Sequence, residues 1–385
     1  MSIEASVTVC PPGGAAPLSS SLFTPYTLRG VTLPNRVWMA PMCQYSAPAE
    51  GADTGAPTDW HLQHYGARAV GGPGLILVEA TAVVPEGRIS PYDLGIWNDI
   101  QVRAHRRITS FLDAHGVVPG IQLAHAGRKA STDAAFHGGS PLTSDRLGWR
   151  PVAPSALPFD EGHPVPHELS AEEIQGVVDG FVAAARRAVE AGYRVLEVHA
   201  AHGYLLHEFL SPLSNHREDG YGGPFENRAR LAVEVADAVR AAVPEETALF
   251  FRVSATDWVE PEGWTADDTV RLAALLKEHG VDLLHVSTGG NVPHARIPAE
   301  PGYQVPFAAR VRRETGLPSA AVGLITEPEQ AERILAEGEA DAVALGRELL
   351  LNPYWPREAA LALGEEHPFP PQYGRAARVR RTSRV

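Results

Sequence analysis

The chain has 385 residues, of which 44% are hydrophobic and 21% are charged, and its formal net charge at pH 7 is −13. This composition is ordinary for a globular protein with a sizeable core, and the acidic balance disfavours a nucleic-acid-binding surface, which needs clustered basic side chains. The two cysteines, Cys10 and Cys43, imply no disulfide framework, and no stretch has the roughly 18 consecutive apolar residues of a membrane span. We therefore expect a cytoplasmic protein that does not enter a membrane.

The N-terminal part of the sequence divides into a leader and a hairpin. Residues 1–20 contain Pro11-Pro12-Gly13-Gly14, which disfavours regular structure, and they lack the basic start of a signal peptide, so we expect a flexible leader. From Tyr26 to Leu33, apolar residues alternate around Arg29-Gly30, a pattern that predicts a β-hairpin. Such a hairpin would close the bottom of a barrel.

Beyond this hairpin, segments typical of strands alternate with segments typical of helices. The predicted strands are Val37–Met42, Leu75–Ala80, Val118–His125, Val195–Ala200, Leu249–Ser254, Leu283–Thr288, Ser319–Leu324 and Asp341–Leu345. The predicted helices are His61–Ala69, Ile100–Ala114, Ala171–Ala191, Glu226–Ala242, Ala266–His279, Phe307–Thr315 and Glu327–Glu337. Ser170 and Thr265 stand directly before two of these helices, where a hydroxyl can cap the first backbone amides.

This alternation predicts a parallel sheet, and eight strands without a leftover edge predict a single-domain (β/α)₈ TIM barrel over residues 21–372. A doubly wound open sheet is the alternative, but it requires a Gly-rich dinucleotide-binding loop after its first strand. The residues after Met42 are Cys43-Gln44-Tyr45-Ser46, which lack that pattern. The long segment 127–168 predicts a loop over the catalytic face, and residues 373–385 predict an Arg-rich tail.

Polar side chains gather at the C-terminal ends of the predicted strands, which form the catalytic face of an α/β barrel. The fourth strand ends in His199 and breaks into a Gly-containing loop that carries His202 and Tyr204. The other strand ends supply Cys43, Tyr45, Glu79, Gln122, His125, Arg128, Lys129 and Arg252. The pattern indicates a reaction centre with imidazoles that donate hydrogen bonds and a phenol that gives up a proton.

The last two strands end in Gly323 and in Gly346-Arg347. Loops after the seventh and eighth strands of such barrels commonly bind phosphate through backbone N–H groups, which glycine lets approach closely. Arg347 would add a charge-assisted hydrogen bond. These residues therefore predict a phosphorylated cofactor or substrate.

Gln122 and Arg252 suit a flat heterocycle with imide-like edges, because the amide offers a donor and an acceptor and the guanidinium stabilises developing negative charge. Arg252 in an ion pair with Glu79 or Glu197 inside the barrel is the alternative interpretation. Each of the neighbouring groups also has a simpler reading: Tyr204 as a packing residue, and Cys43 as a small buried hydrophobe.

A metal site is a further alternative, since His199 and His202 are spaced as His-x-x-His with a cysteine nearby. Zinc sites need three or four protein ligands, and no carboxylate other than Glu79 stands at a strand end. We therefore expect no metal.

Eight strings of the sequence resemble a known family. They are APMCQYSA (40–47), VEATAV (78–83), IQLAHAGRKA (121–130), HAAHGYLLHEFLSPLSNHREDGYGG (199–223), ENRAR (226–230), FRVSA (251–255), VGLI (322–325) and ALGREL (344–349). Together, over about residues 22 to 375, they resemble the old yellow enzyme family of FMN-dependent ene-reductases and NADPH dehydrogenases. Cys43 with Tyr45 resembles its thermophilic-like bacterial branch.

The resemblance implies an FMN-bound (β/α)₈ barrel with tightly but non-covalently bound FMN. It implies that FMN is held by Ala40, Pro41, Met42, Cys43, Ala80, Gln122, Arg252, Gly346 and Arg347. We expect Gly323 to bind FMN as well. It implies that His199 and His202 bind the substrate oxygen, that Tyr45 and Lys129 line the same pocket, and that Tyr204 is the proton donor. Cys43 would tune the flavin potential.

The implied reaction is a ping-pong cycle in which NADPH, or NADH, reduces the flavin and an activated alkene is then reduced. The implied assembly is a homodimer or homotetramer in which Arg375 reaches the pocket of a neighbouring subunit, although Ala376-Ala377 follows where the family usually has Gly-Trp. Two other functions stay open: a metal-dependent barrel hydrolase or lyase, and a non-catalytic FMN-binding redox module.

Overall fold

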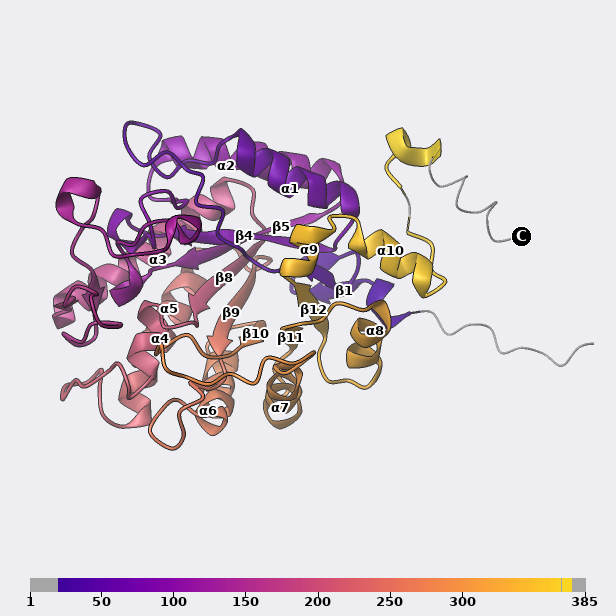
Figure 1. Ribbon diagram of the computed structural model, residues 1–385. Coiled ribbons are helices and arrows are strands. Elements are labelled where there is room, and N and C mark those ends of the chain that lie inside the picture. The colour runs from indigo at the N-terminus through magenta and orange to yellow at the C-terminus, as the bar shows by residue number, and fades with distance from the viewer. Residues whose placement is uncertain (1–19, 368, 376–385) are drawn as a thin grey trace, which may run out of the picture.

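A computed structural model describes residues 20–367 and 369–375 (Figure 1). Eight parallel strands close into a barrel, in which each strand pairs with the next along the chain and the last, β12, pairs with the first, β3. The strands are β3 (Val37–Met39), β4 (Leu75–Ala82), β5 (Val118–Ala124), β8 (Val195–Ala200), β9 (Ala248–Ser254), β10 (Leu283–Ser287), β11 (Ser319–Val322) and β12 (Ala342–Leu345). The predicted (β/α)₈ barrel is confirmed, and the open-sheet alternative is wrong.

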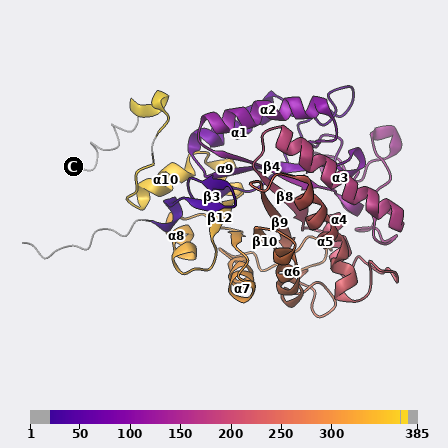
Figure 2. The same cartoon turned by 180° about the vertical axis from the view of Figure 1, so that it is seen from behind.

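Helices surround the barrel on all sides in both views (Figures 1 and 2). They are α1 (Asp59–Gly71), α2 (Asp99–Ala114), α3 (Ala171–Glu190), α4 (Leu205–Leu210), α5 (Phe225–Ala242), α6 (Ala266–Glu278), α7 (Val305–Thr315), α8 (Pro328–Ala336), α9 (Arg347–Leu351) and α10 (Trp355–Ala362). The hydroxyls of Ser170 and Thr265 cap α3 and α6, as predicted. Among the described residues, no helix combines the length and the hydropathy needed to cross a membrane.

Two strands end more than one residue earlier than predicted. β3 stops at Met39 rather than Met42, because Pro41 has no N–H to donate to a neighbouring strand. β11 stops at Val322, because Gly323 and Leu324 have φ values of 119° and 50°, which are incompatible with a strand. The residues that follow β3 and β11 therefore lie at the rim of the barrel and are not paired as strands.

Three helices were not predicted: α4, α9 and α10. The sequence predicted a Gly-containing loop after the fourth strand and no helix at Leu205–Leu210. All six side chains of α4 are buried, so this helix lacks the alternation of polar and apolar faces that reveals a helix in a sequence. Its short length, six residues, leaves too few positions to detect a period.

The bottom of the barrel is closed by the predicted hairpin. β1 (Tyr26–Leu28) pairs with β2 (Val31–Leu33) in antiparallel register. Leu28, Val31 and Leu33 share one apolar cluster with residues at the N-terminal ends of the barrel strands, among them Leu75 and Val195. The hairpin therefore excludes water from the end of the barrel opposite the polar strand ends.

A second contact fastens the chain beside the hairpin. The carboxylate of Glu332 on α8 accepts hydrogen bonds from the backbone N–H groups of Ser21 (2.8 Å) and Leu22 (2.9 Å) and from the hydroxyl of Ser20. Ser20, the last residue of the predicted leader, is buried. The rest of that leader, and residues 376–385 of the predicted tail, lie outside the described residues.

Replacing Glu332 by Ala should lower the free energy of unfolding by about 1 kcal/mol or more, because the donors of Ser20, Ser21 and Leu22 lose a charged acceptor. Urea denaturation followed by circular dichroism measures the change. Glu329→Ala is the control, since Glu329 is an exposed carboxylate in the first turn of the same helix. Equal effects of the two substitutions would show that helix charge, rather than this contact, sets the stability.

Candidate active site

The turn that follows β8 brings the two predicted histidines and the predicted tyrosine together. The ring centre of His199 lies 5.2 Å from that of His202 and 4.9 Å from that of Tyr204, in both cases edge to face. His202 and Gly203 have φ values of 59° and 72°, so two successive residues are left-handed. A left-handed histidine costs energy unless its surroundings hold it.

Side chains from other strands hold the backbone of this turn. The N–H of His202 donates to Ser254 Oγ (2.9 Å), and Lys129 Nζ donates to the carbonyls of His202 (2.9 Å) and Gly290 (3.1 Å). A Cβ on Gly203 would lie 2.3 Å from the Gly290 oxygen, so only glycine fits there. The turn after β8 is thus fixed by contacts with the ends of β5, β9 and β10.

Both imidazoles are neutral. Burial, and next to it the charge of Arg252, lowers the pKa of His199 and of His202 well below the ordinary range. Each ring therefore carries one N–H. The N–H of Ala201 points to His199 Nδ1 at 3.3 Å, which leaves the His199 proton on Nε2, where no described residue accepts it.

The tautomer of His202 depends on two residues that the sequence analysis missed. His202 Nε2 lies 2.7 Å from Ser287 Oγ, and Ser287 Oγ lies 3.2 Å from Gln304 Oε1. Gln304 Oε1 can only accept, and it accepts from Ser287 Oγ and from Thr288 Oγ1 (2.8 Å), so the Ser287 oxygen accepts from His202 and the His202 proton is on Nε2. Both missed residues lie at or beyond the C-terminal end of β10, where a strand-end survey could have included Ser287.

The acidic groups at the site keep their protons. Burial raises the pKa of the Tyr204 phenol well above its ordinary value. Burial, reinforced by the carboxylates of Asp93 and Glu79, raises the pKa of the Cys43 thiol in the same direction. Tyr204 is therefore a phenol that retains a proton to donate, and Cys43 is a thiol rather than a thiolate.

A buried guanidinium without a partner lies beside this turn. Arg252 is 8% exposed, and its Nε has no hydrogen-bond partner among the described residues. The alternative ion pair is not formed: Glu197 accepts from Gln122 Nε2 (2.8 Å) and lies 2.7 Å from His285 Nδ1, while Glu79 serves other donors. A buried cation of this kind calls for an anionic or strongly accepting ligand.

The remaining predicted cofactor residues lie at the ends of adjacent strands. Ala40 follows β3 and packs with Val322 of β11 and Ala344 of β12. Gly346 precedes α9, and a Cβ there would lie 3.6 Å from Met42 Sδ, so the two strand ends are close together. The other four occupy the positions expected of them: Pro41 at the rim after β3, Ala80 buried in β4, Gly323 directly after β11 and Arg347 as the first residue of α9.

The long segment after β5 lies over the mouth of the barrel. The exposed ring of Phe136 meets the ring of Tyr45 edge to face, with centres 6.0 Å apart, and Tyr45 is itself left-handed, with a φ of 49°. Phe159 lies against the ammonium group of Lys129, 4.6 Å from its ring centre. Arg375 is not brought to this site: it is exposed and forms no hydrogen bond or ion pair with the described residues.

The arrangement matches that of known flavin enzymes. Residues 21–366 match the family described as the NADH:flavin oxidoreductase / NADH oxidase family. The chain belongs to this family. The NADPH dehydrogenase of Geobacillus thermodenitrificans is 50% identical over 361 residues, which cover 94% of this chain and 100% of the relative.

Two solved structures agree with the assignment. Morphinone reductase in complex with tetrahydroNAD has a TM-score of 0.72 and 31% identity, covering 91% of this chain and 93% of its own. The old yellow enzyme homologue from Zymomonas mobilis has a TM-score of 0.73 and 31% identity, covering 88% of this chain and 92% of its own. The chain is an FMN-dependent NAD(P)H oxidoreductase of the old yellow enzyme family.

The chemistry of the barrel mouth fits FMN. The isolated guanidinium of Arg252 on β9 suits a ring that becomes negatively charged on reduction, and the Gln122 amide on β5 suits an imide edge. Among the described residues, no group of three or more His, Cys, Asp or Glu side chains could hold a metal ion.

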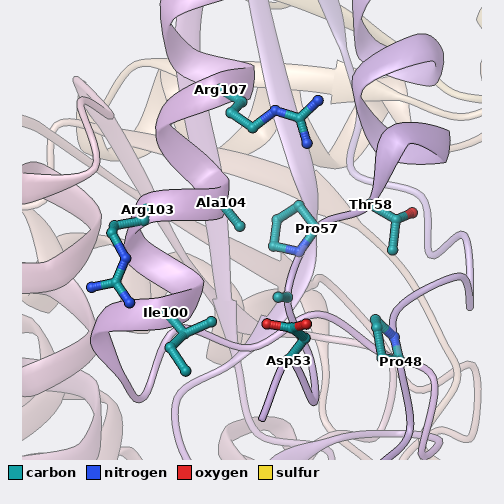
Figure 3. Close-up of a pocket in the computed structure, with 9 residues that line it drawn as sticks. Pro48, Asp53, Pro57, Thr58, Ile100, Arg103, Ala104 and Arg107 are labelled. Carbon is teal, nitrogen blue, oxygen red and sulfur yellow. The ribbon is translucent and has the colours of Figure 1, made fainter. Parts of the chain in front are cut away.

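A separate groove of about 400 Å³ lies between the loop after β3 and helix α2 (Figure 3). It is lined by Pro48, Asp53, Ala56, Pro57, Thr58, Ile100, Arg103, Ala104 and Arg107. Arg107 pairs with Asp59 at 2.8 Å, and Asp53 lines the same groove as Arg103. Because acidic and basic groups balance there, the groove has no clear preference for a charged ligand.

Replacing Arg252 by Met should weaken FMN binding about 10- to 100-fold, the equivalent of the ~1.5–3 kcal/mol of a hydrogen bond to a charged group. The ratio of flavin to protein absorbance after dialysis measures the loss. Arg271→Met is the control, because Arg271 lies on the outer helix α6 and pairs with Glu226 in solvent. Full retention of FMN by the Arg252 variant would contradict the role of this residue.

Proposed function

We propose that the protein is an ene-reductase, which uses NADPH or NADH to reduce activated C=C bonds of α,β-unsaturated aldehydes, ketones, imides or nitroalkenes. One observation carries the proposal: a protonated, half-buried phenol, Tyr204, lies against His199, which with His202 forms a pair of neutral imidazoles at one strand end. Two hydrogen-bond donors beside a general acid are what polarisation and protonation of such an alkene require. Membership of the family supplies the redox cofactor.

FMN would be held by the residues that surround the barrel mouth on β3, β4, β5, β9, β11 and β12. They are Ala40, Pro41, Met42, Cys43, Ala80, Gln122, Arg252, Gly323, Gly346 and Arg347. The N–H groups near Gly323 and Gly346, with Arg347, suit the phosphate, whereas Gln122 and Arg252 suit the ring. When bound, the flavin supplies the hydride that it has taken from the nicotinamide cofactor.

His199 and His202 would bind the oxygen of the substrate. His199 offers its Nε2–H, because Ala201 occupies Nδ1. His202 would offer its Nε2–H, shared between Ser287 Oγ and the substrate oxygen. Two donors on one oxygen withdraw electrons from the conjugated double bond and leave its β-carbon ready to accept hydride.

Tyr204 would then protonate the α-carbon. Its phenol retains the proton at neutral pH, and the Lys129 ammonium group, 5.1 Å from the ring centre, stabilises the phenolate that forms. Tyr45 and Lys129 would line the substrate pocket, and the Cys43 thiol would tune the flavin potential. A homodimer or homotetramer and a cytoplasmic location complete the proposal, and Arg375, far along the chain and exposed, would serve a neighbouring subunit.

Replacing Tyr204 by Phe should slow alkene reduction about 100-fold or more, the contribution expected of a general acid, and leave flavin reduction by NADPH unchanged. Stopped-flow absorbance measures the two half-reactions separately, with cyclohexenone as the alkene. Tyr221→Phe is a control, since Tyr221 bonds Glu234 on the outside of the barrel. Equal slowing of both half-reactions in the Tyr204 variant would remove its role as proton donor.

The rate of alkene reduction should fall as pH rises through about 8. Burial lowers the pKa of Lys129 to about 8, so its charge is present below this pH and is lost above it. Without that charge the Tyr204 phenol is a weaker acid. The Lys129→Met variant should lack the fall near pH 8; a fall of the same size in the variant would assign the ionisation to another group, such as Glu208, whose pKa burial raises to about 8.

A further inference from the structure

We propose that His207, oriented by Asp257, is a positioning residue that fixes the turn carrying His202 and Tyr204 for proton transfer. The proposal rests on the proposed role of Tyr204. Neither His207 nor Asp257 touches the barrel mouth, and both side chains are completely buried, with exposed fractions of 0%. Because both side chains are completely buried, their effect on a substrate would pass through the residues of the turn.

The contact with the turn is a single hydrogen bond. The N–H of Gly203, in the peptide that joins His202 to Gly203, donates to His207 Nδ1 at 2.9 Å. The carbonyl of the same peptide accepts from Lys129 Nζ at 2.9 Å. Both ends of one peptide plane are therefore held by side chains, from opposite directions. This plane separates the imidazole of His202 from the phenol of Tyr204.

The direction of that bond dictates the protonation of His207. Because Nδ1 accepts the Gly203 N–H, the ring proton is on Nε2, which faces Asp257 Oδ1 at 3.1 Å in a polar contact that is not aligned as a hydrogen bond. The other oxygen of Asp257 accepts from Ser211 Oγ (2.5 Å) and from the N–H of Trp264 (2.9 Å). Burial alone would raise the pKa of Asp257, but His207 and these donors lower it, so the carboxylate stays ionised.

The peptide needs such support because its own backbone conformation is strained. His202 has a φ of 59°, which costs about 1–3 kcal/mol for a residue with a side chain. Rotation of the peptide would move His202 and Tyr204 together, away from the geometry required to bind the oxygen and protonate the carbon. A displacement of about 1 Å in such a group costs on the order of 100-fold in rate.

The test uses the flavin-loaded protein and separates the half-reactions. Leucine at position 207 fills similar space but accepts no hydrogen bond, so His207→Leu should slow alkene reduction of cyclohexenone by about 100-fold and leave flavin reduction by NADPH unchanged. His207→Asn should restore most of the rate, because its Oδ1 can accept the Gly203 N–H. A uniform loss in both half-reactions, or no rescue by Asn, overturns the proposal.

A double substitution tests the route of the effect. If His207 acts through Tyr204, adding His207→Leu to Tyr204→Phe should cost little more than Tyr204→Phe alone. Losses that multiply overturn the proposal. His105→Leu is the matched control, since His105 is equally buried but bonds Tyr193, which precedes β8, and the Gly95 carbonyl, and it should slow neither half-reaction.

A spectroscopic measurement tests the protonation of His207 independently of enzyme activity. The ¹⁵N shifts of His207 should show an unprotonated Nδ1 and a protonated Nε2 in the wild type, and a protonated Nδ1 overturns the proposal. If His207→Leu fails to fold by circular dichroism, Asp257→Asn decides. The neutral amide removes the negative charge that faces His207 Nε2, so only alkene reduction should slow. A wild type unable to reduce cyclohexenone refutes the proposed function, whereas the tautomer still reports on the His207 contact.

Discussion

The site depends on one peptide group, the one between His202 and Gly203. Its two flanking residues are left-handed, and a Cβ on Gly203 would collide with the Gly290 carbonyl. Such a backbone persists only when hydrogen bonds over-determine it. Lys129 from the loop after β5, Ser254 from β9 and His207 from α4 supply those bonds. The two imidazoles and the phenol are therefore placed by the closure of the barrel rather than by their own loop.

Electrostatics explains why neutral imidazoles stand here. Arg252 and Lys129 are cations next to the same turn, and a charged histidine among them would add repulsion to the cost of burial. A neutral ring has one N–H, so its tautomer decides what it can do. The backbone of Ala201 sets the tautomer of His199, and Ser287 sets that of His202. Small hydrogen-bonding groups around the rings thus determine the chemistry that the rings perform.

Much of the fold followed from the sequence because repeated strand–helix units leave a strong periodic signal. The eight strands, seven of the helices and the hairpin were predicted with errors at their ends, whereas α4, α9 and α10 were missed. α4 was missed because all its side chains are buried, although it carries His207 and Glu208, which hold two loops of the site. A sequence shows which residues are polar, but it does not show which buried carbonyl each one reaches.

Lys129 illustrates that limit. Its position after β5 predicted a pocket residue, and its ammonium group does lie beside Tyr204, but two of its hydrogen bonds go to backbone carbonyls from two other loops. For Arg252, the sequence left two partners open, a carboxylate or a ring. The structure shows that Glu197 and Glu79 contact other residues, which leaves the ring.

The distribution of these hydrogen bonds also indicates which residues could be substituted without disturbing the turn after β8. Of the groups that hold the His202–Gly203 peptide, Ser254 and His207 are buried in β9 and α4, and Lys129 is half-buried directly after β5. Phe136, by contrast, is 66% exposed and meets Tyr45 through ring contact alone. Exchanging Phe136 would reshape the mouth without breaking a hydrogen bond of the turn. The geometry for proton transfer is therefore fixed by residues at the strand ends and in α4, whereas the shape of the barrel mouth depends on the loop after β5.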